Sequence, residues 1–307
     1  MSKNTKTRMP KFYINAFYES KFKDSLFIVK VGGKIIEDDK SLNNLMRDIK
    51  DLGVHGIKVL LIYGGGNAVD AALKNKNIEV QKHEGRRITD AKTFAVFKDV
   101  IGGQLPLKVY EAMTKNEVAG LSFNAVPAEW LDVNLRQSKE IDYGFVGDIC
   151  QGHGRPVKRL FKTYDFVAIP CLAWADEGTL CNINADTIAT ELAIATKANK
   201  LLFLSDVDGV KINKETAFII TAEQIPGYIK DGTVTGGMKV KMENCARALE
   251  AGVKRVHLIN GLREDALKKE IFEPVGPGTM LIMESERQHY LNEVEAQKVI
   301  EGKKAKS

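Results

Sequence analysis

Lys30 stands where an apolar run meets a pair of glycines, an arrangement that suits the binding of an anion. The run covers residues 27–31, and Gly32 and Gly33 follow it directly. Glycine lets the backbone approach a ligand closely, and a lysine at a strand end supplies a compact positive charge beside it. An ordinary strand-to-turn Gly-Gly with a solvated lysine gives the same pattern. By itself, this motif indicates a phosphate or carboxylate site only weakly.

Three consecutive glycines, Gly64, Gly65 and Gly66, separate a second apolar run from a helical pattern. Such a turn frees backbone N–H groups to point at an anion, and the helix dipole adds about half a positive charge. The stretch matches neither the dinucleotide fingerprint GxGxxG nor the P-loop GxxxxGK[ST]. It therefore predicts an anion site of another kind, with a tight turn that binds nothing as the alternative.

A third glycine-rich stretch, residues 232–241, opens a predicted helix and ends in Lys241. Lys239 and Lys241 cannot share one face of that helix, so we expect at most one of them to point into a site. Three glycine-rich turns together with Lys30 and Lys241 suit a polyphosphate held between opposing positive charges.

Two amides and a carboxylate, those of Asn182, Asn184 and Asp186, lie within five residues at the start of an amphipathic pattern. They could hold a polar substrate and orient ammonium groups, or one of them could simply cap the helix. Arg87 ends a separate basic cluster, and its guanidinium could bind a substrate carboxylate through two hydrogen bonds. The five histidines show no metal-ligand spacing, so we predict no metal site in the chain itself.

Elements that could position these residues alternate along the chain. Apolar runs predict strands over 26–31, 57–63, 166–169, 201–204 and 256–259, and helical patterns cover 41–52, 69–74, 91–111, 185–197 and 241–251. Continuous apolar runs are typical of strands covered on both faces, and strand-helix alternation is typical of a parallel sheet. We therefore predict an α/β fold with an open, mainly parallel sheet sandwiched by helices.

The predicted organisation has an N-terminal arm at residues 1–25, a central domain at 26–284 and a polar, helical C-terminal tail at 285–307. Six basic and two acidic residues lie in the first 24 positions, so most of the net charge of +5 is in the arm. The body is close to neutral, and we expect no nucleic-acid partner. Scattered cysteines and the lack of a long apolar run predict a cytoplasmic protein without a membrane span, with organelle import of the basic N-terminus as the alternative.

Taken in order, these segments resemble the amino-acid kinase family, and within it the N-acetyl-L-glutamate kinases. The resemblance covers about residues 27–282 and rests on an ordered set of motifs: Lys30-Val-Gly-Gly, Gly64-Gly-Gly66, Arg87-Ile-Thr-Asp, Tyr143-Gly-Phe-Val-Gly147, Asn182-Ile-Asn-Ala-Asp186, Leu204-Ser-Asp206-Val-Asp-Gly209, Gly236-Gly-Met-Lys-Val-Lys241 and Gly278-Thr-Met. It implies a carbamate kinase-like fold, with an acceptor lobe at about 26–180 and a nucleotide lobe at 181–284.

The resemblance also implies a role for each matched position. Lys30 and Lys241 resemble the lysines that neutralise the transferring phosphoryl group, and Asp186 resembles the carboxylate that holds them. Acceptor binding would fall to Gly65, Gly66, Arg87, Asn182 and Asn184, and nucleotide binding to Gly32, Gly33, Asp206, Gly209 and Thr235, with Gly32, Gly33, Gly65 and Gly66 presenting N–H groups to phosphoryl oxygens. The implied substrates are ATP, with Mg²⁺ carried by its phosphates, and N-acetylglutamate. A homo-oligomer and inhibition by arginine are further expectations from the same resemblance.

Two departures from the family pattern concern the acceptor more than the reaction. Glu84-Gly-Arg86-Arg87 stands where the family commonly has Asn-Gly-Leu-Arg, and Gly120-Leu-Ser-Phe-Asn124 replaces a glycine-rich stretch. The alternatives are therefore another acceptor, such as a blocked α-aminoadipate, a uridylate or a carbamate, or a non-catalytic amino-acid-sensing domain. The kinase domain of bifunctional acetylglutamate synthase/kinases is also similar, but about 23 residues follow Glu284, and we expect no synthase activity.

Overall fold

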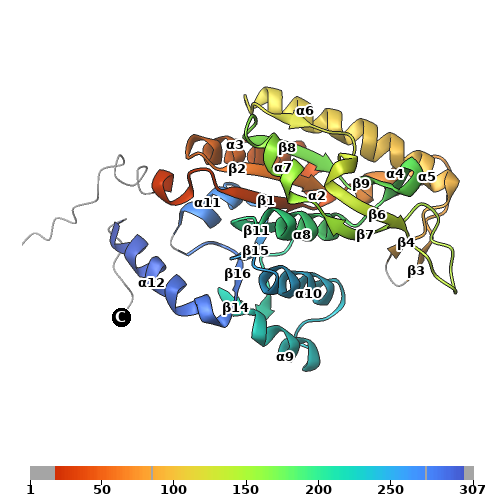
Figure 1. The fold of residues 1–307 in the computed structure, drawn as a ribbon. Helices are drawn as coiled ribbons and strands as arrows, with labels where there is room; N and C mark the ends of the chain where they lie inside the picture. Colours follow the sequence, from red (N-terminus) through yellow and green to blue (C-terminus); the bar gives the residue numbers. More distant parts are fainter. Residues whose placement is uncertain (1–17, 84–85, 274, 301–307) are drawn as a thin grey trace, which may run out of the picture.

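An eight-stranded sheet forms the centre of the protein (Figure 1). The computed structural model describes residues 18–83, 86–273 and 275–300. The strands of the sheet are β1 (Leu26–Val31), β2 (Lys58–Tyr63), β5 (Leu121–Ser122), β8 (Phe166–Pro170), β11 (Lys200–Ser205), β14 (Ile219–Thr221), β15 (Val256–Asn260) and β16 (Thr279–Ile282). They lie in the order β14-β16-β15-β11-β1-β2-β8-β5, and only β15 and β16 pair antiparallel. The predicted mainly parallel sheet is confirmed.

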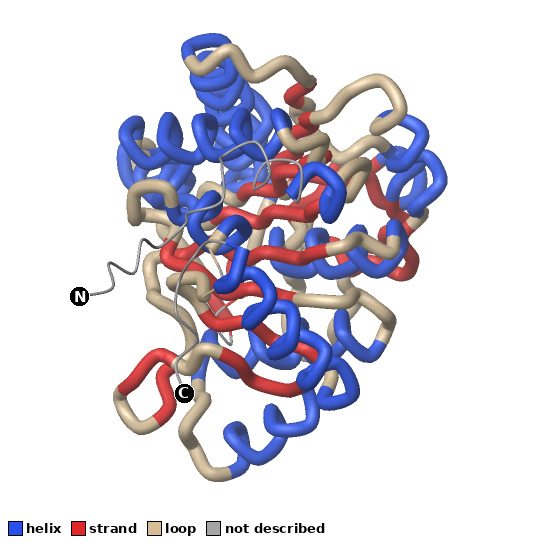
Figure 2. The backbone as a smooth tube through the Cα atoms, turned by 90° about the vertical axis from the view of Figure 1, so that its left-hand side faces the viewer, coloured by secondary structure: helices blue, strands red, loops and turns tan. Residues whose placement is uncertain are grey.

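Helices cover both faces of this sheet, as Figure 2 shows. They are α2 (Gly33–Glu37), α3 (Asp39–Val54), α4 (Gly66–Asn75), α5 (Ala91–Phe97), α6 (Leu105–Lys115), α7 (Gly154–Leu160), α8 (Ala185–Thr196), α9 (Ile225–Lys230), α10 (Gly236–Glu250), α11 (Ala266–Phe272) and α12 (Glu284–Ile300). A π-helical segment, Lys98–Gln104, joins α5 to α6. α3 and α6 lie on one face, and α8 and α10 pack together on the other.

Short antiparallel hairpins stand outside the main sheet. They pair β3 (Lys82–His83) with β4 (Arg86–Arg87), β6 (Leu131–Leu135) with β7 (Gly147–Gly152), β9 (Leu172–Ala175) with β10 (Thr179–Asn182), and β12 (Lys211–Ile212) with β13 (Glu215–Thr216). The sequence did not predict them. Most of these strands are too short for a periodic pattern to distinguish them from loops.

Both ends of the described chain pack on the body. Tyr18 and Phe22, in a short helix at 18–22, are buried, and the ring centroid of Tyr18 lies 4.9 Å from that of Phe272. α12 buries Tyr290 and Val294 against the strand β16. Most of the predicted arm and residues 301–307 of the predicted tail lie outside the described residues, and the domain boundaries stay a prediction.

β1 is the strand at which the strand order reverses, because strands that follow it in the chain lie on both of its sides. From β1 the chain crosses through α2 and α3 to β2 on one side, whereas α8 leads into β11 on the other side. In open α/β sheets, ligands bind at such a switch point, outside the carboxyl ends of the strands. Phe27, Ile28 and Val29 of β1 are fully buried, and Lys30 is the polar exception that reaches this edge.

Candidate active site

Asp186 lies between two lysines at the carboxyl edge of the sheet. Its Oδ1 atom is 2.7 Å from Nζ of Lys30, and its Oδ2 atom is 3.0 Å from Nζ of Lys241. Lys30 comes from β1, Asp186 from the first turn of α8 and Lys241 from the second turn of α10. The three predicted residues therefore meet, although each belongs to a different element.

The electrostatics of this group favour an ionised carboxylate. Burial by itself would raise the pKa of Asp186, but the charges of Lys30 and Lys241 outweigh burial and lower that pKa below its ordinary value. With both lysines protonated, one negative and two positive charges leave a net positive charge in a mostly buried place. Such a group attracts an anion and holds its two cations in fixed positions.

Only one of the two lysines in the third glycine-rich stretch reaches this group. Lys241 points to Asp186, and its Nζ atom also lies 4.9 Å from the ring centroid of Phe203. Lys239 is exposed and lies 3.9 Å from Glu243, one turn further along the same helix. The prediction that the two lysines diverge is confirmed.

Two of the predicted glycine turns touch each other. A β-carbon built on Gly33 would lie 3.3 Å from Cα of Gly65 and 3.4 Å from N of Gly66, and one on Gly65 would overlap the side chain of Leu105. These positions need glycine because the turns are packed together. Gly33 and Gly66 begin α2 and α4, where N–H groups lie outside the intrahelical bonding pattern.

Gly32 does not match the role expected for its amide. Its N–H donates to the carbonyl oxygen of Leu204 at 3.0 Å, so the prediction that this group faces a phosphoryl oxygen is wrong. The bond ties the end of β1 to the neighbouring strand β11. Gly32 therefore fixes the turn that carries Gly33.

Glu37 connects the two turns, a contact that no motif in the sequence indicates. Its Oε1 atom accepts a hydrogen bond from the N–H of Ala68 at 3.0 Å, in the first turn of α4. A β-carbon on Gly33 would lie 2.8 Å from the same oxygen. One side chain at the end of α2 thus occupies the space next to the first turn and bonds to the helix after the second.

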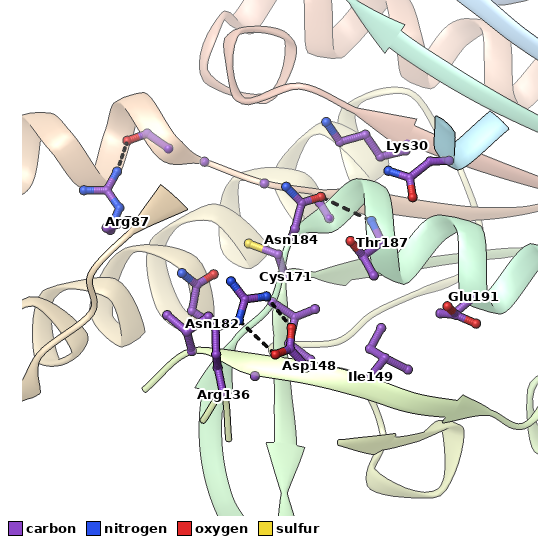
Figure 3. A pocket seen from close by; sticks show the side chains of 18 of the residues that line it. Lys30, Arg87, Arg136, Asp148, Ile149, Cys171, Asn182, Asn184, Thr187 and Glu191 are labelled. Carbon is purple, nitrogen blue, oxygen red and sulfur yellow. Dashed lines mark hydrogen bonds and ion pairs between the residues drawn. The ribbon is translucent and has the colours of Figure 1, made fainter. Parts of the chain in front are cut away.

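A cavity of about 620 Å³ opens next to these turns (Figure 3). Seven predicted residues line it: Lys30, Gly33, Gly65, Gly66, Arg87, Asn182 and Asn184. Asp186 and Lys241 do not line it, although Asp186 contacts Lys30, which does, and Asp206, Gly209 and Thr235 are also outside the lining. The predicted acceptor residues therefore meet in the lining together with Gly33, whereas the predicted nucleotide residues Asp206, Gly209 and Thr235 do not line this cavity.

Arg87 has hydrogen-bonding capacity left for a ligand. One guanidinium nitrogen, Nη2, pairs with Asp70 and lies 3.4 Å from the carbonyl oxygen of Gly66. The Nη1 atom is buried and has no hydrogen-bond partner among the described residues. A buried donor without a partner is costly, so a bound carboxylate at this position would be stabilised.

The two asparagines differ in what they do. Asn184 is the N-cap of α8, where its Oδ1 atom accepts from the N–H groups of Asp186 and Thr187 at 2.8 and 3.2 Å. The capping alternative for this residue is therefore confirmed, and its cap orients the turn that carries Asp186. Asn182 makes only a long contact, 3.4 Å, from Nδ2 to Oγ1 of Thr89, and its side chain lines the cavity.

The predicted nucleotide residues follow β11 and precede α10. Asp206 pairs with Lys34 on the first turn after β1, and this hydrogen bond lowers the pKa of Asp206. Gly209 has a φ of +133°, and a β-carbon there would lie 2.5 Å from Oγ1 of Thr279. Thr235 is the N-cap of α10, but its side chain makes no capping hydrogen bond to that helix.

Sequence reasoning missed two ion pairs in the cavity wall. Arg136, directly after β6, pairs with Asp148 on β7, and Arg247 on α10 pairs with Glu191 on α8. All four residues line the cavity. No motif marks them, because each pair joins residues from separate elements.

In the described part of the chain, no three His, Cys, Asp or Glu residues are grouped as ligands for a metal ion. The helices of the same part lack the combination of length and hydropathy that a bilayer span requires. All four cysteines are free, and Cys171, Cys181 and Cys245 are buried.

Comparison with known proteins identifies the family to which the chain is related. A model of the amino acid kinase family matches residues 25–260. The chain belongs to this family. Within the amino acid kinase family it is 34% identical to the acetylglutamate kinase of Halothermothrix orenii, over 89% of this chain and 94% of that protein. It is 33% identical to the acetylglutamate kinase of Campylobacter hominis, over 86% of this chain and 93% of that protein.

Solved structures of similar fold include members with different reactions. The N-acetylglutamate synthase of Neisseria gonorrhoeae superposes with a TM-score of 0.79 at 22% identity, over 89% of this chain but only 63% of that one. The carbamate kinase of Giardia lamblia gives a TM-score of 0.56 at 15% identity, over 85% of this chain and 99% of that one. At these identities the likeness concerns the fold, which matches the predicted amino-acid kinase and carbamate kinase-like architecture.

Proposed function

We propose that this amino acid kinase transfers the γ-phosphoryl group of ATP to the γ-carboxylate of N-acetyl-L-glutamate. The products are N-acetyl-L-glutamyl 5-phosphate and ADP, a step of arginine biosynthesis. The observation that carries the proposal is the Lys30–Asp186–Lys241 group beside a cavity that also holds Arg87 and Asn182. The similarity to two acetylglutamate kinases over nearly their whole length supports it.

The reaction asks the protein for alignment and charge stabilisation. The acceptor carboxylate is already ionised at neutral pH, so no general base is needed for its attack on phosphorus. Lys30 and Lys241 would neutralise the transferring group, Asp186 would hold both lysines, and Gly33, Gly65 and Gly66 would approach the phosphoryl oxygens with their backbone. Arg87 would bind the α-carboxylate, and Asn182 the acylated amino group, beside the Asn184 cap.

The nucleotide would contact Asp206, Gly209 and Thr235, near the carboxyl end of β11 and the start of α10. Magnesium would arrive on the ATP phosphates and add further charge neutralisation there. Lys34 follows Gly33 directly and pairs with Asp206, so this pair joins one of the proposed nucleotide residues to the first glycine turn.

Two other functions remain as alternatives to test: phosphorylation of another blocked amino acid, such as an α-aminoadipate derivative, and sensing without catalysis. An assay that couples ADP release to NADH oxidation separates them when run with N-acetyl-L-glutamate, with N-acetyl-α-aminoadipate and without acceptor. Release that depends on N-acetylglutamate supports the proposal. A preference for aminoadipate, or no release with any acceptor, supports the first or second alternative.

We also propose that the protein is a cytoplasmic homo-oligomer. Free, mostly buried cysteines fit a reducing compartment, and α6 exposes the large hydrophobic side chains of Leu107 and Tyr110. Light scattering tests the assembly, because particle mass divided by chain mass gives the number of subunits. A Leu107→Glu variant, or a chain lacking residues 1–23, should have fewer subunits per particle than the full chain. The same number of subunits in both variants as in the full chain would contradict this part of the proposal.

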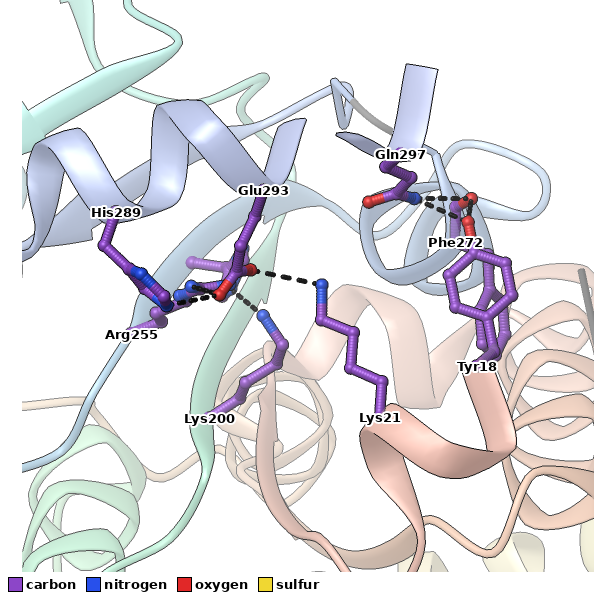
Figure 4. A network of polar contacts seen from close by, with 9 residues as sticks. Tyr18, Lys21, Lys200, Arg255, Phe272, His289, Glu293 and Gln297 are labelled. Carbon is purple, nitrogen blue, oxygen red and sulfur yellow. Dashed lines mark hydrogen bonds and ion pairs between the residues drawn. The ribbon is translucent and has the colours of Figure 1, made fainter. Parts of the chain in front are cut away.

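Arginine is proposed as an inhibitor that acts away from the cavity described above. A separate cavity of about 440 Å³ lies among the N-terminal helix, the start of β11, residues 254–255 before β15, and α12. Figure 4 shows the polar contacts of several residues that line it. There Glu293 pairs with Lys21 and Arg255 at 3.2 and 2.9 Å, and these pairs with cationic side chains support the choice of this carboxylate as the group that an arginine ligand would contact. Arginine should lower the rate with the unmodified protein and do so less with Glu293→Gln; insensitivity of the unmodified protein would refute this.

A further inference from the structure

Arg136 and Asp148 form a charge pair in the wall of the main cavity. The Nε atom of Arg136 donates to Oδ2 of Asp148 at 2.8 Å, and Nη2 donates to Oδ1, so both carboxylate oxygens are engaged. The guanidinium also lies over the ring of Tyr143, 5.2 Å from its centroid. This contact and the two hydrogen bonds fix the arginine side chain in one orientation.

The backbone places this pair next to Asn182. The N–H of Arg136 donates to the carbonyl oxygen of Val146 at 2.8 Å, and Val146 forms a parallel bridge with Asn182. Arg136, Val146 and Asn182 are thus lateral neighbours, and all three line the cavity. Figure 3 shows Arg136 and Asp148 side by side below Asn182, with Arg87 and Lys30 further away.

This arrangement indicates where the acyl substituent of an acceptor would lie. With the α-carboxylate at Arg87, the γ-carboxylate near Lys30 and the acylated nitrogen at Asn182, the acyl group is left to face Val146 and the ion pair. The pair has no net charge, and Asp148 already engages two nitrogens of Arg136. A carboxylate carried by the acyl group would find the Arg136 guanidinium already neutralised, with the like charge of Asp148 beside it, and its binding would be disfavoured.

We propose that the Arg136–Asp148 pair determines acyl-group specificity, and that Asp148 restricts the acceptor to uncharged acyl groups. The inference rests on the proposed function and names the determinant of its substrate class. It follows the general rule that an interface achieves specificity by a repulsive element against the wrong ligand as well as by attraction to the right one. Without the charge of Asp148, Arg136 would become a free cation next to the acyl group.

The test compares N-acetyl-L-glutamate with N-succinyl-L-glutamate, whose acyl group carries a carboxylate. For Asp148→Asn, the ratio of kcat/KM for the succinyl acceptor to that for the acetyl acceptor should rise at least tenfold over the unmodified protein. Adding Arg136→Met to Asp148→Asn should abolish the gain. Asp132→Asn is the matched control, because Asp132 lies on the same hairpin, pairs with His153 at 2.9 Å and does not line the cavity.

The outcomes separate this inference from a merely structural ion pair and from the proposed function. If the pair only joins β6 to β7, Asp148→Asn lowers the melting temperature and leaves the acceptor ratio unchanged, and the inference fails. A gain that persists in the double variant, or that appears in Asp132→Asn, also overturns it. If the unmodified protein does not phosphorylate N-acetylglutamate, the proposed function fails first.

Discussion

The Oδ1 atom of Asp186 lies 2.7 Å from the Nζ atom of Lys30, which joins the first turn of α8 to the central strand β1. The second oxygen of the same carboxylate contacts Lys241 on α10. Two ammonium groups this close to one carboxylate would repel each other without it. Asp186 therefore acts by holding both cations, and its loss should disturb both at once.

Replacing Asp186 by asparagine should lower turnover about a hundredfold, the size of effect seen when a preorganised transition-state group is lost. Asparagine keeps the shape of the side chain but removes the charge that balances the two lysines. Steady-state kinetics with ATP and N-acetylglutamate measures the loss, and circular dichroism checks that the fold is retained. Turnover within threefold of the unmodified protein would show that the carboxylate does not organise the site.

Lys241→Ala should reduce turnover at least a hundredfold while the fold is kept, since it removes a cation from the developing phosphoryl charge. Lys239→Ala is the matched control on the same helix, because Lys239 is exposed and contacts Glu243 instead. The control should keep near-normal rates. Equal losses in the two variants would indicate that the charge of the helix, rather than the contact of Lys241 with Asp186, is what matters.

Glu37 should prove to be a positioning residue for the glycine turns. Glu37→Ala removes the acceptor for the Ala68 N–H and the packing next to Gly33, so kcat should fall about tenfold or more with a smaller change in KM for ATP. Glu37→Gln keeps a carbonyl oxygen at the same place and should recover most of the rate. A Gln variant as slow as the Ala variant would mean that the charge of Glu37 acts directly.

Asp48 should make stability depend on pH. Burial raises the pKa of this carboxyl to about 6, against the lowering effect of the hydrogen bonds that it accepts from the N–H groups of Lys268 and Leu267. The folded protein then binds more protons than the unfolded chain between about pH 4 and 6, so the free energy of unfolding falls as pH rises through this window. Above pH 6 the destabilisation is complete.

Asp48→Asn removes the ionisation but keeps an acceptor for the α11 amides. The variant should gain stability relative to the unmodified protein as pH rises from 4 to 7, by at most about 3 kcal/mol for a shift of about two pKa units. Urea unfolding of both proteins at pH 4 and pH 7 measures this difference. A difference that is the same at both values would mean that Asp48 does not titrate in this window.

Much of the fold could be predicted from the sequence because its signals are local. The runs that became β1, β2, β8, β11 and β15 are continuously apolar, and a sheet buried on both faces requires that pattern. Lys30 and Lys241 were recognisable because each stands beside glycines at an element boundary. Their contact through Asp186 was expected from family resemblance, and the structure confirms it.

What the sequence could not show depends on contacts between distant segments. Arg136 and Asp148 meet only because β6 and β7 pair, and Glu37 meets Ala68 only because α2 lies against α4. The misplaced role of Gly32 has the same origin. Its N–H is used by Leu204, a residue of β11 whose position beside β1 follows from the sheet order and not from any local pattern.

Trapping the product tests the central claim most directly. An acyl phosphate reacts with hydroxylamine to give a hydroxamate, so the protein, incubated with ATP, magnesium, N-acetyl-L-glutamate and hydroxylamine, should yield the γ-hydroxamate of N-acetylglutamate in an amount equal to the ADP formed. Mass spectrometry identifies it, and Lys241→Ala should form it at least a hundredfold more slowly. Formation of ADP without hydroxamate, or of neither product, would contradict the account.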